Sequence, residues 1–206
     1  MTEPPEPRRF YAECVPAQFN RALDAQQAKG QAGRRLYEDM RAVDATIRIE
    51  VEGEGGGTFY LNIAQGRMRA SEEASHPPFL TLLQDRRAFE RLVRETGDSA
   101  TALLGGLAGL GGDMQLTRRR IEQLAGLSGL MHFEVTGDDG FTLRTHFGSD
   151  PIRSEADTRI RMDEAVYRDL RSGEIDLQSA FMDLRIAIEG DMQLALQVAL
   201  AAIAAD

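Results

Sequence analysis

An internal repeat is the feature that most constrains how this chain folds. The run Gly-Asp-Met-Gln-Leu at Gly112–Leu116 recurs at Gly190–Leu194. At the same spacing Asp85 corresponds to Asp163, and each of these aspartates precedes an apolar helical pattern as a helix N-cap does. The same order of caps and periodic segments therefore occurs twice, which indicates a duplicated unit of about 80 residues.

Two hairpins supply the β part of the repeat. Alternating apolar and charged residues predict strands over 46–53 and 58–64, and again over 130–137 and 141–147. Similarity aligns Val51 with Val135 on the first strands and Phe59 with Phe141 on the second strands. The predicted fold class is α+β, with two related units that each have a small mixed or antiparallel sheet covered by helices.

The composition divides the chain into three parts. Residues 1–15 are rich in proline and charge, which predicts a flexible arm. Residues 16–126 form a first unit that opens with a helical segment, and residues 127–206 form the second unit. Because the segment 105–112 is mostly glycine where a strand is expected, the first unit is predicted to be degenerate. Units of this size lie near the lower limit for burying a core alone, so they should pack together.

Charge and cysteine content narrow the function classes. A formal net charge of −9 disfavours nucleic acid as a partner, since an acidic surface repels phosphate backbones. One cysteine, Cys14, allows no intrachain disulfide and fits a reducing compartment. The start lacks the apolar stretch of a classical signal peptide, and the apolar run at 194–205 is too short to span a bilayer. We expect a cytoplasmic protein with no transmembrane segment.

Sequence motifs give no support for catalysis. The glycine-rich segment lacks the Gly-Lys-Ser/Thr of a phosphate loop. The three histidines, His76, His132 and His146, have no metal-ligand spacing and are predicted to lie on the surface. No Ser, Cys or His stands in a recognisable nucleophile setting. We expect no catalytic residue, no cofactor and no metal, and we interpret Asp113 and Asp191 as helix N-caps rather than catalytic acids.

The C-terminal third carries a signature that resembles a known family. It consists of Ala180-Phe181-Met182, a short strand over 184–188, and Gly190-Asp191-Met192 before an apolar helix. This arrangement resembles the sterol carrier protein type 2 family of nonspecific lipid-transfer proteins. The resemblance covers residues 130–204 well and 45–126 more weakly, which implies a tandem of two such units. The usual glycine after the Phe-Met pair is absent, and Asp183 and Leu184 stand there instead.

The resemblance implies a function and a site. It implies an apolar tunnel between sheet and helices that binds sterols, fatty acids or acyl-CoA esters without chemistry. We predict that the second unit holds the better pocket, bounded by Phe141, Ile160, Phe181, Met182, Met192 and Leu196. Ordinary core packing of these side chains is the alternative for the site. A non-catalytic scaffold or accessory subunit with closed tunnels is the alternative function, and a homodimer or a protein partner stays open.

Overall fold

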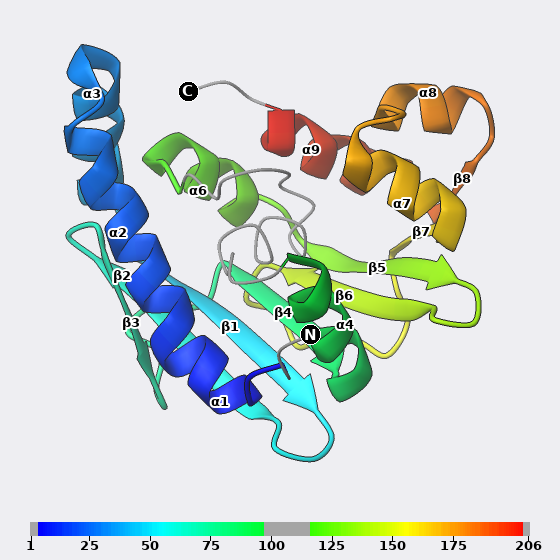
Figure 1. Cartoon of the computed structure of the whole chain (residues 1–206), viewed down its shortest axis with the longest axis horizontal. Helices are drawn as coiled ribbons and strands as arrows, with labels where there is room; N and C mark the ends of the chain where they lie inside the picture. The colour runs from blue at the N-terminus through cyan, green and yellow to red at the C-terminus, as the bar shows by residue number, and fades with distance from the viewer. Residues whose placement is uncertain (1–3, 97–115, 204–206) are drawn as a thin grey trace.

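Eight β-strands of the described residues form one continuous mixed sheet (Figure 1). The computed structural model describes residues 4–96 and 116–203. Across the sheet the strands follow the order β3, β2, β1, β4, β6, β5, β7, β8. Their bounds are β1 Ala45–Glu52, β2 Gly57–Ala64, β3 Arg67–Ser71, β4 Leu80–Asp85, β5 Gly129–Thr136, β6 Phe141–Phe147, β7 Thr158–Asp163 and β8 Ile186–Gly190.

Helices pack against the apolar face of this sheet. Alternate residues of the strands, such as Ile49 of β1 and Val135 of β5, join one hydrophobic core with the helices. The helix bounds are α1 Pro7–Arg9, π-helix η1 Phe10–Cys14, α2 Val15–Gln27, α3 Gly30–Arg41, α4 Arg86–Thr96, α6 Arg118–Ala125, α7 Glu164–Ser172, α8 Leu177–Met182 and α9 Met192–Ile203.

The repeat predicted from the sequence is present in the strand pairing. β1 runs parallel to β4, and β5 runs parallel to β7. The last pairs of these two ladders are Glu52 with Asp85 and Thr136 with Asp163. The hairpin alignment already matches Glu52 to Thr136, and the cap alignment matches Asp85 to Asp163. The register therefore agrees with both alignments, and the duplication is confirmed.

Each parallel ladder ends at an aspartate that caps the next helix. The backbone N–H of Ala88 donates to Asp85 Oδ1 at 2.7 Å, and that of Val166 donates to Asp163 Oδ1 at 2.8 Å. Such bonds satisfy N–H groups that have no partner within the helix itself. α4 and α7 consequently leave the sheet at equivalent positions, as the repeat predicts.

The predicted alignment of Phe59 with Phe141 on the second strands is wrong. Gly57 pairs with Val51, and Phe141 pairs with Val135. Phe141 is therefore equivalent to Gly57 rather than to Phe59, because the two connecting turns have the same length. A slip of two positions keeps every side chain on the same face of a sheet, so alternation alone does not detect it.

The sheets of the two units join at one pair of strands. β4 pairs with β1 on one edge and antiparallel with β6 on the other. In the second unit the equivalent edge of β7 pairs with β8. β6 therefore lies beside β4 in the position that β8 has beside β7. The two small sheets predicted from the sequence are consequently joined into one sheet. The glycine-rich segment 105–112, predicted to replace that strand in the first unit, lies outside the described residues.

The prediction of a flexible arm over 1–15 is wrong for residues 7–15. These residues are helical, and Phe10 and Tyr11 are 2% and 0% exposed. The Phe10 ring packs edge-on against Phe89 at 5.5 Å, and the amide of Gln84 donates to the Tyr11 hydroxyl. Proline and charge density indicated disorder, but the aromatic pair supplies enough apolar surface to hold this segment against the core. Burial raises the pKa of Tyr11.

The N-terminal helical segment is divided in two at Gly30. α2 ends at Gln27, and Gly30 has a φ of +73°, a conformation that favours glycine. Gly33 instead lies inside α3, where a Cβ atom would meet the Gln26 carbonyl oxygen at 2.2 Å. α3 therefore starts in close contact with the end of α2, and α2 lies along β3 at the edge of the sheet (Figure 1).

On β5 and β7 the face of the sheet opposite to the core carries charged side chains. Glu134 of β5 lies between two arginines of β7, with Arg159 Nε at 2.8 Å and Arg161 Nε at 3.1 Å from its carboxylate oxygens. Cross-strand pairs of opposite charge stabilise a sheet modestly. Matched pairs therefore keep this face polar.

Candidate functional site

Capping aspartates position both helices at the end of the second unit. Asp176 Oδ1 accepts from the backbone N–H of Ser179 at 2.9 Å and begins α8. Asp191 Oδ1 accepts from Gln193 at 2.9 Å and from Leu194 at 3.1 Å and begins α9. The N-cap interpretation of Asp191 is confirmed, whereas Asp113 lies outside the described residues.

α9 has one buried and one exposed apolar face. Its inner residues are almost fully buried, namely Leu194, Ala195, Val198 and Ala201. Its outer face carries Met192, Leu196 and Leu200, which are 49%, 59% and 53% exposed. These three residues follow each other at intervals of four, so they form one stripe on the helix.

The end of α8 displays a second group of apolar side chains. Phe181, Met182 and Leu184 are 42%, 71% and 89% exposed. Leu184 has a φ of +57°, because the chain turns back so that Arg185 N–H donates to the Ala180 carbonyl at 2.9 Å. The strand predicted over 184–188 starts at Ile186 for the same reason.

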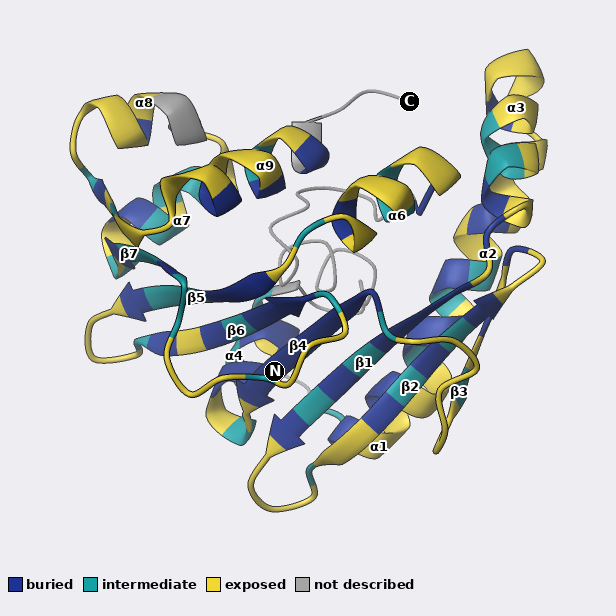
Figure 2. Cartoon of the chain, turned by 180° about the vertical axis from the view of Figure 1, so that it is seen from behind, coloured by how far each residue is buried: buried dark blue, intermediate teal, exposed yellow. Residues whose placement is uncertain are grey.

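Figures 1 and 2 show α8 at one end of the molecule and α9 running from near that end towards the middle. We call their exposed apolar side chains the α8–α9 surface; it comprises Phe181, Met182, Leu184, Met192, Leu196 and Leu200. A left-handed conformation is unfavourable for leucine. Leu184 nevertheless holds its side chain in solvent there, which makes it the most exposed member of this surface.

The six residues of the predicted pocket fall into two groups. Phe141 is 7% exposed on β6, and Ile160 is half-buried on β7 and packs against the core. The other four, Phe181, Met182, Met192 and Leu196, belong to the α8–α9 surface. The pocket beneath α9 stays a prediction.

Phe141 belongs to a cluster that ties α4 to α7. Its ring lies 5.3 Å from that of Tyr167, and the guanidinium of Arg91 lies 5.1 Å from its centroid. The Tyr167 hydroxyl donates to Glu95 Oε2 at 2.8 Å. Burial and the Glu95 carboxylate both raise the pKa of Tyr167. These contacts join the two units away from the strand junction.

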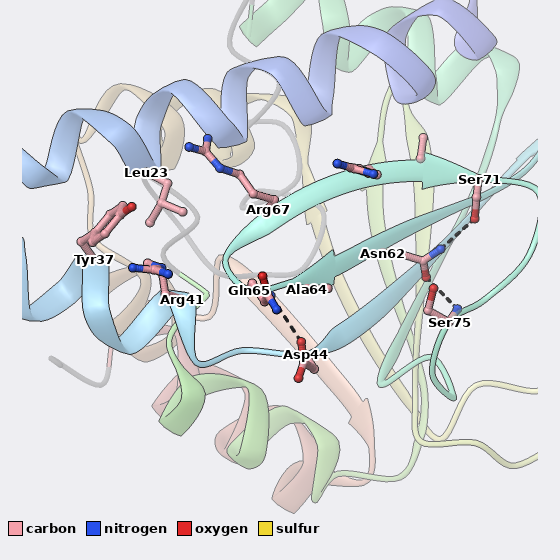
Figure 3. A pocket seen from close by; sticks show the side chains of 12 residues that line it. Leu23, Tyr37, Arg41, Asp44, Asn62, Ala64, Gln65, Arg67, Ser71 and Ser75 are labelled. Carbon is pink, nitrogen blue, oxygen red and sulfur yellow. Dashed lines mark hydrogen bonds between the residues drawn. The ribbon is translucent and has the colours of Figure 1, made fainter.

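A cavity of about 810 Å³ lies in the first unit, between α2–α3 and the β2–β3 hairpin (Figure 3). We call it the arginine cavity, because three arginines contribute to its walls. It is lined by Leu23, Tyr37, Arg41, Asp44, Asn62, Ala64, Gln65, Arg67, Arg69, Ala70, Ser71 and Ser75. Its volume is in the range of small-molecule sites.

Hydrogen bonds fix the walls of the arginine cavity. Both guanidinium NH groups of Arg67 donate to Asp24, at 3.0 and 2.7 Å, and fasten β3 to α2. Asn62 donates to Ser71 Oγ at 2.7 Å and accepts from the Ser75 N–H at 2.9 Å (Figure 3). The cavity is therefore bounded by side chains that are held in place.

A family model matches the chain twice, over residues 25–125 and 118–202. The model describes the SCP-2 sterol transfer family, and its two matches together span most of the sequence. The chain belongs to the SCP-2 sterol transfer family. The double match agrees with the duplication seen in the strand register, so the chain is a tandem of two SCP-2 units.

Solved structures of the same family are also similar. Sterol Carrier Protein 2 Like 2 from Aedes aegypti is 14% identical, with 55% of this chain and 98% of that chain covered and a TM-score of 0.35. The sterol carrier protein domain 2 of Helicoverpa armigera is 20% identical, with 58% and 91% covered and a TM-score of 0.33. The UbiJ-SCP2 ubiquinone synthesis protein is 13% identical, with 92% and 89% covered and a TM-score of 0.26. A search of curated proteins returned no match.

The described part of this SCP-2 tandem contains no evident metal centre. Within residues 4–96 and 116–203, no group of three or more His, Cys, Asp or Glu is placed to hold a metal ion. None of the helices described there is long and apolar enough to cross a membrane.

The prediction that the histidines lie on the surface is wrong for His146, which is 5% exposed. It lies on β6 between Thr81 of β4 and Leu130 of β5, so strands flank it on both sides. Burial lowers the pKa of His146, and burial together with Arg159 lowers that of His132. His146 thus belongs to the interior of the joined sheet.

Sequence reasoning missed the arginine cavity. Arg67 and Arg69 alternate with the buried Met68, which is the ordinary pattern of an exposed strand face. The contribution of Arg41 depends on how α3 meets the hairpin, and no local pattern specifies that contact. The sequence signal for this cavity is the close spacing of Arg67 and Arg69 in a chain that is acidic as a whole.

Proposed function

We propose that this chain binds or transfers an apolar small molecule, such as a fatty acyl chain or a sterol, through its second unit and without catalysis. One observation carries the proposal. Among the residues whose exposure the structure describes, the large hydrophobic side chains that are exposed lie between 181 and 200. Exposed apolar side chains grouped in this way mark binding surfaces.

Membership of the SCP-2 sterol transfer family supports this class of ligand. The side chains themselves suit it, because methionines such as Met182 and Met192 adapt to ligands of different shape. Removing one such side chain from water contributes ~1.5–3 kcal/mol, so several contacts together can offset the cost of association. The single cysteine fits a reducing compartment, and a cytoplasmic location is part of the proposal.

Two locations for the ligand are distinguishable. In our proposal it contacts the outer α8–α9 surface. In the tunnel arrangement expected from the family it lies beneath α9, where Ala195 faces inward. Leu196→Gln removes apolar contact from the outer face, and Ala195→Trp fills space beneath the helix.

Titration with a fluorescent fatty acid tests the proposal. We expect Leu196→Gln to weaken binding about tenfold, which corresponds to ~1.4 kcal/mol. The neighbouring Gln197→Ala, also exposed on α9, serves as the control and should bind like the wild type. If Ala195→Trp weakens binding and Leu196→Gln does not, the ligand lies beneath α9. Equal affinity in all three folded variants would exclude both locations.

A non-catalytic scaffold is the second candidate function. The inner face of α9 is filled, with Leu194 and Val198 at 3% and 4% exposure. A closed unit would leave the α8–α9 surface for a protein partner or a second copy. Native mass spectrometry of gently purified protein separates the two functions. A co-purifying small mass supports the carrier, whereas clean apo protein that fails to bind the fatty acid supports the scaffold.

A further inference from the structure

The arginine cavity of the first unit has a charge that contrasts with the rest of the chain. Its walls include three arginines, Arg41, Arg67 and Arg69, and one acid, Asp44. The whole chain has a formal net charge of −9. The walls of this cavity thus carry more arginines than acids in an acidic protein, and such a local surplus of positive charge attracts anions.

Two of these arginines are available to a ligand. Arg67 is held by Asp24. Among the described residues, Arg41 and Arg69 form no ion pair; the guanidinium of Arg41 lies 5.7 Å from the ring centre of Tyr37. Stacking on a ring orients a guanidinium and leaves its N–H donors directed outward. A guanidinium binds carboxylate or phosphate with paired, charge-assisted hydrogen bonds.

The remaining lining defines the kind of anion. At about 810 Å³ the cavity is larger than a bare inorganic ion requires. The Tyr37 ring and the methyl groups of Ala64 and Ala70 supply apolar wall, and Ser75 supplies a hydroxyl group. Figure 3 shows Tyr37 and Arg41 from α3 at one end and Asn62, Ser71 and Ser75 at the other. Such a wall fits an organic molecule with one anionic group.

We propose that the arginine cavity binds the phosphate or carboxylate group of a small organic anion through one of the two arginines that form no ion pair within the described part of the chain, Arg41 or Arg69. The site belongs to the first unit, and it does not depend on the apolar-ligand function proposed for the second. The organic part of the anion lies against Tyr37. A lipid headgroup and a water-soluble organic phosphate share this chemistry, and the choice of probes distinguishes them.

Isothermal titration calorimetry with glycerol phosphate and with dodecyl phosphate below its micelle concentration tests the site. We expect Arg41→Gln/Arg69→Gln to weaken phosphate binding at least about tenfold, as the loss of charge-assisted hydrogen bonds implies. Arg168→Gln is the matched control, because Arg168 is exposed on α7 in the other unit. Unchanged thermal unfolding shows that the variants are folded.

The pattern of results identifies the source of the anion. Comparable binding of both probes, sensitive to the double variant, indicates a water-soluble organic phosphate. Binding of dodecyl phosphate alone, with the same sensitivity, indicates a lipid headgroup. If neither phosphate binds, or if the double variant binds both as the wild type does, the proposal is wrong. Leu196→Gln addresses the α8–α9 surface separately, so failure there leaves this test intact.

Discussion

The two units share a strand register but differ in what they expose. In the first unit the N-terminal helices cover the sheet, and its described large hydrophobic side chains are buried or half-buried. In the second unit α8, the turn after it and α9 display six exposed apolar side chains. Backbone pairing and capping aspartates were retained in both copies, whereas the helical surfaces diverged. A duplicated fold thus keeps its hydrogen-bonded frame while each copy acquires its own surface.

The largest expected effect concerns the helical cover of the first unit. Phe10→Ala should lower the free energy of unfolding by about 3–5 kcal/mol, because a buried aromatic side chain leaves a cavity. Urea unfolding measures the change, and the exposed Arg9→Ala serves as control. A loss below about 1 kcal/mol would mean that residues 7–15 are not an integral part of this unit.

A smaller effect concerns His146 in the joined sheet. Burial lowers its pKa in the folded state, so the unfolded chain binds the proton more readily below pH ~6.5. The stability that neutral His146 contributes is therefore present above pH ~6.5 and is lost as pH falls towards its lowered pKa. Asp150 and Asp157 oppose this shift of the pKa.

Urea unfolding between about pH 7.5 and 5 checks this dependence. The slope should be at most ~1.4 kcal/mol per pH unit for one histidine. His146→Gln should flatten it, and His76→Gln, at an exposed position, should not. The same slope in the wild type and in both variants would show that protonation of His146 does not change the free energy of unfolding.

Asp85 and Asp163 should stabilise their helices by similar amounts, because they occupy equivalent positions in the repeat. Asp85→Ala and Asp163→Ala should each lower the free energy of unfolding by about 1 kcal/mol, because each removes an acceptor from the first turn of a helix. Thermal unfolding of the two variants compares them directly. A clear loss at one position and none at the other would show that the copies no longer share this feature.

The smallest expected effect is at Leu184. Glycine adopts its φ of +57° without strain, so Leu184→Gly should raise stability by about 0.5 kcal/mol despite the greater freedom of glycine when unfolded. The same change should weaken binding of a fluorescent fatty acid. Reduced stability with unchanged binding would show that Leu184 is not strained and does not contact the ligand.

The sequence specified the repeated frame but not the surfaces. The alternation around Ile49 and the caps Asp85 and Asp163 are local signals, so strands and helix starts followed from them. The joining of β4 to β6 and the packing of Phe10 depend on contacts far apart in the chain, which periodicity does not encode. Phe181 and Leu196 were recognised as apolar site residues, but their exposure depends on how α8 and α9 pack.

The central claim is that the second unit, and not the first, contacts apolar ligands. Methyl NMR of the protein titrated with decanol tests it most directly, since an uncharged alcohol avoids the arginine cavity. The methyl signals of Met182 and Met192 should shift, and those of the buried Met40 and Met68 in the first unit should stay in place. Shifts at Met40 and Met68 with none at Met182 and Met192 would contradict the claim.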